Sequence, residues 1–279
     1  MEGGVSEPAG TLYVVSTPIG NMGDFSFRGV ETLRSVATVL AEDTRHTRHL
    51  LDRYEIDVPL VAYHEHNEAK STPGLVTRLL GGESLALVSD AGTPLLSDPG
   101  ARLVRAAADA GVRVSPVPGP SALLAALVAS GLDVDRFTFL GFLARKGHER
   151  RSAIGDVIAS PHVVVLYEAA NRTAGTLAEL AAAGAGERAT VVARELTKQH
   201  EELRRGTVAE LAAYYEQTPP RGEVVIVIAG RTPEALDEEE LRARAAELRA
   251  QGRSARDVAA ALSAELGAPR NVAYRLAHE

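Results

Sequence analysis

The amino-acid sequence predicts an α/β protein with two α/β domains and a short helical extension. Short apolar runs that suit buried strands alternate with segments whose apolar residues recur at near-helical spacing. This alternation begins again after residue 136, and beyond Gly230 the composition shifts to Ala, Glu and Arg. We therefore expect α/β domains at residues 11–136 and 137–230 and a helical extension at 231–279. Residues 1–10 are rich in glycine and should form a disordered lead-in.

The first domain should alternate strands and helices. Strands are expected at Thr11–Ser16, Thr38–Glu42, Leu60–Tyr63, Leu85–Val88 and Arg113–Val117. Helices are expected at Phe27–Ala37, Thr44–Tyr54, Pro99–Ala110 and Ser121–Ser130. Asp98, Pro99 and Gly100 should open the third of these helices. The fourth is apolar on every face, which predicts a buried helix.

Three strands of this domain run into loops of small residues and proline. These loops are 17–21 (TPIGN), 89–94 (SDAGTP) and 118–122 (PGPSA). In an open α/β sheet, ligands bind beyond the carboxyl ends of the strands. Such residues are also ordinary loop formers, so the second loop alone supports a binding site and a plain turn equally. The repetition of the pattern favours a binding site, and its composition favours a largely uncharged ligand such as a nucleoside.

The second domain should follow a connector at Gly131–Arg136. Strands are expected at Phe137–Phe142, His162–Glu168, Ala189–Glu195 and Glu223–Ala229, with helices at Arg172–Ala183 and Val208–Glu216. Ala144–Arg151 is a basic segment that suits a solvated loop or a binding surface. In the extension, helices are expected at Pro233–Ala250, Ala255–Leu266 and after Pro269, and the last two resemble a helix-turn-helix. This extension suits RNA contact and a packing or dimer role about equally.

Composition narrows the classes of function. The chain has 279 residues, no cysteine and a formal net charge of −7. The absence of cysteine excludes disulfides, thiolate nucleophiles and Cys-ligated metal sites. The acidic balance argues against a general nucleic-acid coat but leaves room for a local basic face. No apolar run reaches the length of a membrane span, and no signal peptide is evident, so we expect a cytoplasmic protein.

Sequence motifs exclude several common ligand sites. No GxxxxGK[ST], strand–GxGxxG–helix or GxSxG pattern is present, which argues against a P-loop, a dinucleotide site and a serine-hydrolase elbow. The histidines at 46, 49, 64 and 66 invite a metal interpretation. Their spacing lacks HExxH, and surface or substrate roles explain them more simply. We therefore expect no metal.

Seven stretches in the same order carry a resemblance to a known family. They are Gly10–Asp24, Ala41–Leu51, Tyr63–Glu68, Leu87–Gly100, Val117–Leu127, Phe139–Gly147 and Ala193–Glu202. Together they resemble the tetrapyrrole methylase superfamily. AEDTRHT at Ala41–Thr47 and SDAGTPLLSDPG at Ser89–Gly100 resemble its branch that methylates small-subunit ribosomal RNA, rather than its corrin and haem-precursor enzymes. The C-terminal helices are similar to the small extension of that branch.

The resemblance implies two α/β domains with S-adenosylmethionine (SAM) in the cleft between them. It also implies methyl transfer to the ribose 2′-hydroxyl of a cytidine in the decoding region of 16S rRNA, within the 30S subunit, by a homodimer. The implied cofactor contacts are Pro18, Ile19, Gly20, Asp90, Ala91, Gly92, Thr93, Leu95, Leu96, Ser121, Ala122, Tyr167 and Arg194. One departure is that Ala169, Ala170 and Asn171 replace the Ser-Pro-His that the family usually has.

The chemistry of methyl transfer makes modest demands on side chains. An activated methyl needs alignment with its acceptor, and a ribose hydroxyl also needs help to lose its proton. We hypothesise that Glu42 is the base and that Lys198 stabilises the developing alkoxide. Candidate RNA contacts are Arg45, His64, Arg145 and Lys146. Two alternatives are methylation of a tetrapyrrole or modified protein residue, and a non-catalytic ribosome-binding protein.

Overall fold

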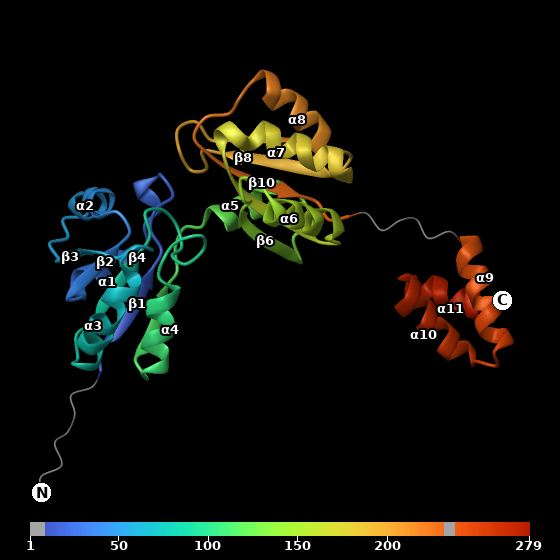
Figure 1. Ribbon diagram of the computed structural model, residues 1–279, viewed down its shortest axis with the longest axis horizontal. Helices are drawn as coiled ribbons and strands as arrows, with labels where there is room; N and C mark the ends of the chain where they lie inside the picture. Colours follow the sequence, from blue (N-terminus) through green and yellow to red (C-terminus); the bar gives the residue numbers. More distant parts are fainter. Residues whose placement is uncertain (1–8, 232–237) are drawn as a thin grey trace, which may run out of the picture. The chain divides into compact units, whose positions relative to one another are not determined.

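The computed structural model describes residues 9–231 and 238–279. The chain forms two compact units, residues 1–231 and 232–279, which we describe separately (Figure 1). Most of the expected lead-in, residues 1–8, lies outside the described residues, as do residues 233–237 of the expected extension helix.

The larger unit begins with a parallel sheet of five strands in the order β3-β2-β4-β1-β5. The strands are β1 (Thr11–Val15), β2 (Thr38–Ala41), β3 (Leu60–Ala62), β4 (Leu85–Val88) and β5 (Arg113–Val117). All residues of β2 and β4 are buried, as is typical of strands covered on both faces. These five strands confirm the strand expectations to within one residue.

Helices cover both faces of this first sheet. They are η1 (Met22–Asp24), α1 (Phe27–Ser35), α2 (Thr44–Arg53), α3 (Glu68–Leu80) and α4 (Ala101–Asp109). One core joins Leu33 of α1 and Leu51 of α2 to Val39, whereas another joins Leu79 of α3 and Leu103 of α4 to the opposite face. Ser26 and Asp43 cap α1 and α2 through their side chains, which explains where these helices begin.

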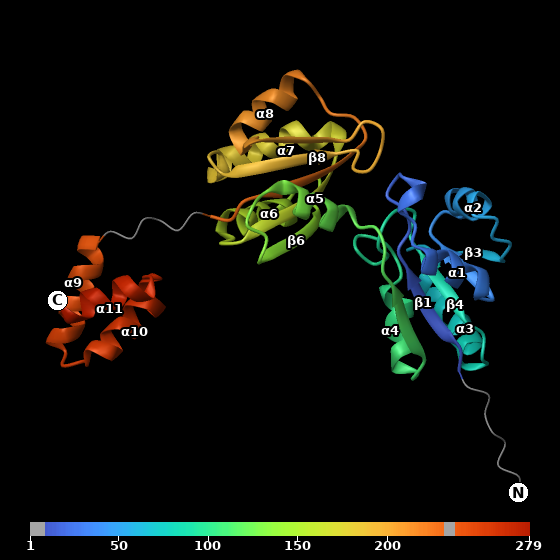
Figure 2. The same cartoon turned by 180° about the vertical axis from the view of Figure 1, so that it is seen from behind.

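The second sheet is mixed, with the order β6-β7-β10-β8-β9. Figure 2 labels two of its strands, β6 and β8. Its strands are β6 (Phe137–Phe142), β7 (Val163–Ala169), β8 (Ala189–Arg194), β9 (Glu202–Thr207) and β10 (Glu223–Ile228). β6 and β7 are parallel, and the remaining pairs are antiparallel. Its other elements are α5 (Ala122–Ser130), α6 (His148–Ala159), η2 (Ala170–Arg172), α7 (Thr173–Leu180), η3 (Ala181–Ala185) and α8 (Val208–Gln217).

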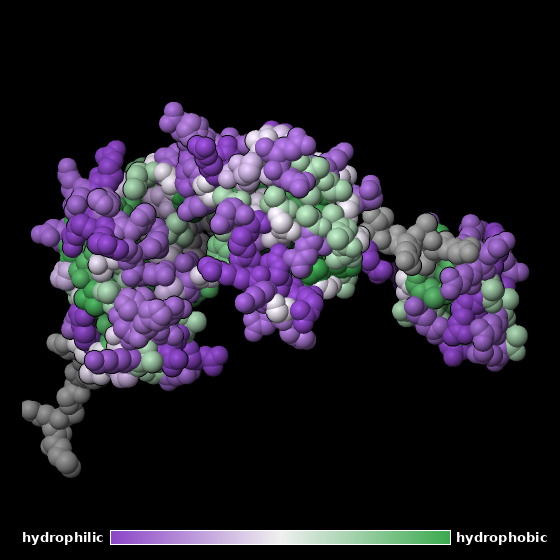
Figure 3. Space-filling view, turned by 45° about the horizontal axis from the view of Figure 1, so that its top comes forward, coloured by the Kyte–Doolittle hydropathy of each residue, from purple (hydrophilic) through white to green (hydrophobic). Residues whose placement is uncertain are grey.

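The two faces of the second sheet have separate cores. Side chains of α6, α7 and α8 pack on one face, around Ile154, Leu177 and Leu211. In the space-filling view, weakly hydrophobic residues are interspersed with hydrophilic ones over this part of the molecule, as expected from alanine-rich helices (Figure 3). The opposite face packs against Leu123 and Leu127 of α5. The helix that follows β5 therefore packs on the second sheet, not on the first.

The expectation that this apolar helix is buried on every face is wrong. Leu124 is 52% exposed and Val128 is 79% exposed, although Leu123 and Ala126 are buried. The physical reason is that α5 has a sheet on one side only, so its opposite face has no cover within the described chain.

The structure has α3, α6 and β9 at positions where the sequence analysis predicts no helix or strand. The basic segment Ala144–Arg151 is not a solvated loop throughout, because α6 begins at His148 and Arg150 is only 9% exposed. Likewise, α4 begins at Ala101 instead of Pro99. The domain boundary at Arg136 stays a prediction.

The second unit is a bundle of α9 (Glu238–Ala250), α10 (Ala255–Leu266) and α11 (Arg270–His278). Leu248, Leu262 and Leu276 form its core. Ser254 caps α10 and Gly267 ends it in a left-handed conformation with φ of 68°, as the sequence predicts. Across residues 9–231 and 238–279, no helix combines the length and apolar character that crossing a membrane requires.

Candidate functional site

A cavity of about 450 Å³ lies at the carboxyl ends of the first sheet and is also lined by the second sheet. Its lining consists of Ile19, Glu42, Asp90, Ala91, Gly92, Thr93, Leu96, Ser97, Asp98, Ala122, Phe142, Tyr167, Glu168, Ala169 and residues 222–225. Concave sites with apolar walls and a few polar groups are the usual form of small-molecule sites.

Hydrogen bonds join the three predicted strand-end loops. Thr17 and Gly92 exchange two backbone bonds, with N···O distances of 2.8 and 3.1 Å. Thr93 Oγ1 donates to the carbonyl of Pro120 at 3.1 Å and lies 3.1 Å from Ser16 Oγ. The expected convergence is confirmed, because β4, β1 and β5 are neighbours in the sheet.

The second of these loops has an unusual backbone. Gly92 has φ of 80°, and a Cβ there would lie 3.2 Å from Ile19 Cγ2. Leu95 and Ser97 also have positive φ, at 75° and 76°. Left-handed conformations of non-glycine residues are costly and concentrate at functional sites. This backbone brings Leu96, Ser97 and Asp98 to the cavity wall.

Three carboxylates of the first sheet share the cavity: Glu42, Asp90 and Asp98. Burial, together with the negative charges of Glu42 and Asp90, raises the pKa of Asp98 to about 6. Burial and the charge of Asp90 also raise the pKa of Glu42. Asp98 is therefore not confined to opening a helix, which corrects the sequence interpretation. The clustering favours a cationic ligand and disfavours phosphate, since carboxylates repel anions.

Aromatic rings form the wall that the second sheet contributes. The Tyr167 ring makes edge contacts with Phe139 and Phe142, at centroid distances of 4.8 and 5.6 Å. Burial raises the pKa of Tyr167, which keeps its hydroxyl neutral at physiological pH. These rings and Ile19 give the cavity an apolar side that suits a nucleobase.

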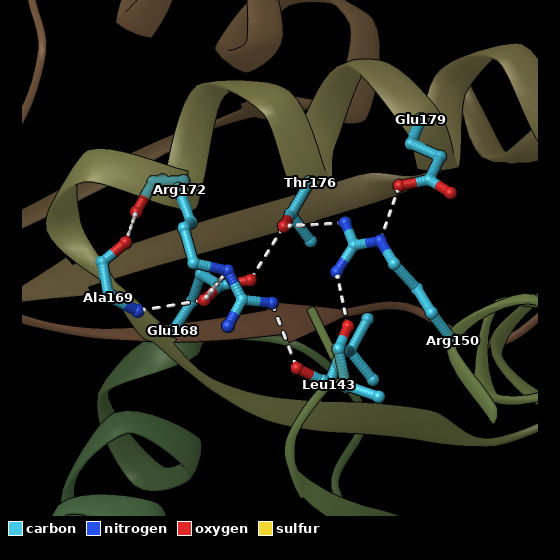
Figure 4. Close-up of polar contacts among 9 residues, drawn as sticks. Leu143, Arg150, Glu168, Ala169, Arg172, Thr176 and Glu179 are labelled. Carbon is cyan, nitrogen blue, oxygen red and sulfur yellow. Dashed lines mark hydrogen bonds and ion pairs between the residues drawn. The ribbon is translucent and has the colours of Figure 1, made fainter. Parts of the chain in front are cut away.

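Glu168 is a buried carboxylate that also lines the cavity (Figure 4). It accepts hydrogen bonds from Thr176 Oγ1 at 2.6 Å and from the Ala169 amide at 2.8 Å, and it pairs with Arg172 at 3.3 Å. Arg150 donates to Thr176 at 3.0 Å and pairs with Glu179 at 2.7 Å. A buried carboxylate is tolerated only with such partners.

Lys198 lies at the rim without lining the cavity. Its Nζ donates to Glu195 at 2.9 Å and to Glu223, a lining residue, at 2.8 Å. Burial alone would lower the pKa of Lys198, but the two carboxylates outweigh it and raise the pKa. The side chain also packs on Gly20, where a Cβ would lie 2.3 Å from Lys198 Cε.

The predicted cofactor contacts divide into two groups. Those that line the cavity are Ile19, Asp90, Ala91, Gly92, Thr93, Leu96, Ala122 and Tyr167. Those outside its lining are Pro18, Gly20, Leu95, Ser121 and Arg194. Ser121 caps α5 through a bond from the Leu124 amide at 3.4 Å. Arg194 pairs with Glu202 at 3.0 Å and lines another cavity with Tyr214 and Tyr215.

The candidate RNA contacts lie at different positions. Arg45 is exposed on α2 and pairs with Asp43 at 2.9 Å, and this arginine lowers the pKa of Asp43 to about 2. His64 follows β3, and its Nδ1 is buried without a hydrogen-bond partner. Arg145 and Lys146 are exposed between β6 and α6. Arg145 lines a second cavity beside the first.

Several lining residues were not identified from the sequence. They are Ser97, Asp98, Phe142, Glu168, Ala169 and residues 222–225. Phe142 and Glu168 lie at or next to the carboxyl ends of β6 and β7, whereas Glu223 is the first residue of β10. The strand-end pattern that marks the first sheet's loops therefore points to the first two but not to Glu223. No group of three or more possible metal ligands occurs within 9–231 and 238–279.

The comparisons with known proteins agree with this geometry. Residues 11–212 match the family model described as Tetrapyrrole (Corrin/Porphyrin) Methylases. The chain belongs to this family. Among solved structures, the tetrapyrrole methylase fold is shared with a diphthine synthase, at TM-score 0.60 and 15% identity over 78% of this chain and 89% of that one. It is also shared with uroporphyrin-III-C-methyltransferase from Thermus thermophilus, at TM-score 0.56 and 20% identity over 78% and 94% of the two chains.

Sequence relatives within the family are much closer. A Synechocystis protein named "Ribosomal RNA small subunit methyltransferase I" is 45% identical, covering 97% of this chain and 98% of the relative. A Pseudomonas aeruginosa protein of the same name is 47% identical, covering 96% and 97%. The resemblance found in the seven sequence stretches is therefore confirmed.

Proposed function

We propose that this protein is a SAM-dependent methyltransferase that methylates the ribose 2′-hydroxyl of a cytidine in the decoding region of 16S rRNA. The observation that carries the proposal is the cavity shared by the two sheets, which both line with carboxylates and to which the second sheet adds aromatic rings. The relatives named as small-subunit rRNA methyltransferases support rRNA as the substrate.

The lining residues fit SAM. Its sulfonium and ammonium are cations, for which Asp90 and Asp98 provide opposite charge, and its adenine suits the apolar wall of Ile19 and Tyr167. The backbone of Gly92 can approach a ligand closely because it has no side chain. When bound, SAM supplies a methyl group already activated for transfer.

Glu42 is our candidate for the group that takes the proton of the 2′-hydroxyl. It lies at the end of β2 in the cavity wall, and its raised pKa brings it closer to neutral pH. A base works best when its pKa lies near the working pH, while the carboxyl is still ionised.

Lys198 is our candidate for stabilising the alkoxide that develops at the ribose. An ammonium has three N–H donors, and the bonds to Glu195 and Glu223 use two of them. The third donor is free to bind an oxygen of the substrate. Its raised pKa keeps the ammonium charged through the neutral range.

The decisive experiment is methyl transfer from labelled SAM into 30S subunits purified from cells that lack this protein. We expect one methyl per subunit, recovered as 2′-O-methylcytidine after nuclease digestion and mass spectrometry. Protein-free 16S rRNA and an anionic tetrapyrrole serve as parallel substrates. Absence of label in the 30S subunit would refute the proposal, and label in the tetrapyrrole would support that alternative instead.

The proposal also includes an oligomeric state and a partner for this protein. We expect a cytoplasmic homodimer that acts on the 30S subunit, with the helical unit at 232–279 assisting RNA contact. The exposed apolar pair Leu124 and Val128 supports α5 as part of a dimer face. Sedimentation should show a dimer for the wild type and a monomer for Val128→Glu. A wild-type monomer would contradict dimerisation.

A further inference from the structure

A second cavity, of about 580 Å³, directly adjoins the first. Its lining is Phe142, Arg145, Ala169, Asn171 and Arg172. Phe142 and Ala169 line both cavities, so the two are neighbours. We call the second cavity the side groove. Arg145 is already a candidate RNA contact, but the groove as a whole has no role in the function proposed above.

Phe142 presents an aromatic ring to the groove. The residue is 57% exposed at the end of β6, and its ring contacts Tyr167 in an edge arrangement. A single exposed phenylalanine is not unusual. Here, however, the edge contact with Tyr167 restrains the ring, and Tyr167 is in turn in edge contact with Phe139.

The polar groups of the groove favour an anionic, hydrogen-bonding occupant. Arg145 is exposed and forms no ion pair with the parts of the chain that the structure describes. Asn171 is exposed on η2, and its amide offers both a donor and an acceptor. This asparagine stands in the Ala169–Asn171 departure from the usual family pattern.

The backbone that carries these groups is held rigidly. Arg172 Nη2 donates to the carbonyl of Leu143 at 2.8 Å, and Arg150 Nη1 donates to the carbonyl of Ala144 at 3.1 Å (Figure 4). Both arginines belong to the buried network around Glu168 and Thr176. The link between Phe142 and Arg145 is thus fixed at two successive carbonyls. Such preorganisation lowers the entropy lost on binding.

We propose that the side groove binds an unpaired nucleotide next to the methylated cytidine in the RNA. Its base stacks on Phe142, its phosphate pairs with Arg145, and Asn171 faces its polar edge. Stacking on an aromatic ring with a nearby arginine is the usual way to bind single-stranded RNA. This inference rests on the proposed function, since the neighbouring cavity must then hold the reacting ribose.

The test compares two phenylalanines of the same strand. Phe142→Ala should raise the KM for 30S subunits about tenfold, because a stacked base is lost. Phe142→Tyr should retain the wild-type KM. The matched control is Phe137→Ala, since Phe137 is also exposed, at 42%, but lies at the other end of β6. Arg145→Ala should raise the KM severalfold, whereas Arg105→Ala on α4 should not.

Two readouts separate the groove from the cofactor site. The Kd for SAM, measured by calorimetry, should rise much less than the KM for 30S subunits in Phe142→Ala, although Phe142 also lines the first cavity. An equal loss of SAM affinity and subunit affinity would assign Phe142 to the cofactor wall and overturn the inference. An unchanged KM in Phe142→Ala would also overturn it while leaving the proposed function intact.

A binding assay without turnover tests the groove even if the proposed function is wrong. Fluorescence anisotropy with a labelled, unstructured ten-nucleotide RNA, in the presence of S-adenosylhomocysteine, reports on the groove directly. Binding by the wild type that is weakened about tenfold in Phe142→Ala supports the groove, even if 30S subunits accept no methyl. Equal binding by both proteins refutes it.

Discussion

The two sheets of the larger unit face the same cavity but contribute to it in different ways. The parallel sheet contributes loop backbone and small residues, such as Gly92 and Thr93, together with carboxylates. The mixed sheet contributes strand residues with large side chains, such as Phe142 and Tyr167, and the carboxylates of Glu168 and Glu223. Loops that follow parallel strands all lie at one edge, so their backbones are brought together by topology alone.

The difference indicates a division of labour. Backbone that approaches closely suits a ligand of constant structure, which we propose to be SAM. Exposed rings and cations suit a polymer whose flanking nucleotides must also be bound. We expect substitutions of Gly92 and Asp98 to change cofactor affinity and substitution of Phe142 to change substrate affinity. Substitutions of Glu42 and Lys198 should change the rate of methyl transfer. The following predictions run from the largest effect to the smallest.

Glu42→Gln should have the largest effect, since removing a general base costs about 10²- to 10⁴-fold in rate. Single-turnover methylation of 30S subunits at saturating SAM measures it. Glu65→Gln is the matched control, because Glu65 is an exposed carboxylate whose charge acts on Glu42. A full single-turnover rate in Glu42→Gln would eliminate the base assignment.

Lys198→Ala should slow the same step about 10- to 100-fold by removing a cation from the rim. Its loss also leaves Glu195 and Glu223 without a shared partner. Lys198→Arg keeps an ion pair but not the compact ammonium, so it should retain thermal stability more than rate. If Lys198→Ala methylates at the wild-type rate, the residue is a structural ion pair only.

Gly92→Ala should weaken SAM binding about tenfold by placing a methyl group where the ligand approaches the backbone. Gly111→Ala is the control, because it measures the loss of stability that backbone strain causes by itself. The two glycines have similar φ, 80° and 75°, but a Cβ at Gly111 meets no atom within 4 Å. Both variants should lose about 1 kcal/mol of stability. Calorimetry should show reduced affinity for Gly92→Ala alone; equal affinities would contradict the backbone role.

Asp98 should make cofactor affinity depend on pH, with a severalfold effect. Its pKa of about 6 means that it becomes ionised as pH rises through that value, so affinity for a cation should rise between pH 5 and 7. Asp98→Asn should flatten this profile, whereas Asp109→Asn on α4 should not. Titration calorimetry across this range measures it, and a retained slope in Asp98→Asn would rule out the assignment.

Ionisation of Asp98 should lower the stability of the folded protein, although it favours binding of a cationic cofactor. Because the folded state holds the proton more tightly than the unfolded state, the free energy of unfolding should fall as pH rises from about 4 to about 6. Asp98→Asn should therefore be more stable than wild type at pH 7, by about 1 kcal/mol after solvent screening. Urea unfolding of the wild type at about pH 4 and about pH 6 checks the direction of this change in the free energy of unfolding.

The elements that the sequence predicts well have strong local signals. β4 and β10 are apolar runs between breakers, and α10 has Ser254 and Gly267 at its two ends. The missed elements have conflicting signals. α3 contains Pro73, and β9 has the sequence ELRRGT, whose charges are tolerated because it is an edge strand. α6 begins with five polar residues, and the buried Arg150 is paired with Glu179, which is distant in the sequence.

The parts of the site that could be predicted from the sequence also have strong local signals. Loops at Thr17, Gly92 and Ser121 can be predicted because each follows a recognisable strand. Asp98 could not be assigned, since it follows left-handed residues at Leu95 and Ser97, which no local sequence pattern predicts. Phe142 and Glu223 reach the cavity only through pairing of strands that are distant in sequence.

The position of α5 has a consequence for how the molecule folds. Leu123 and Leu127 belong to the hydrophobic core of the second sheet, although the helix is encoded directly after β5. A fragment ending at Arg136 would leave these leucines without cover, and one starting at Phe137 would lack part of its core. The larger unit should therefore unfold in one cooperative transition, and neither half should be a stable product of limited proteolysis.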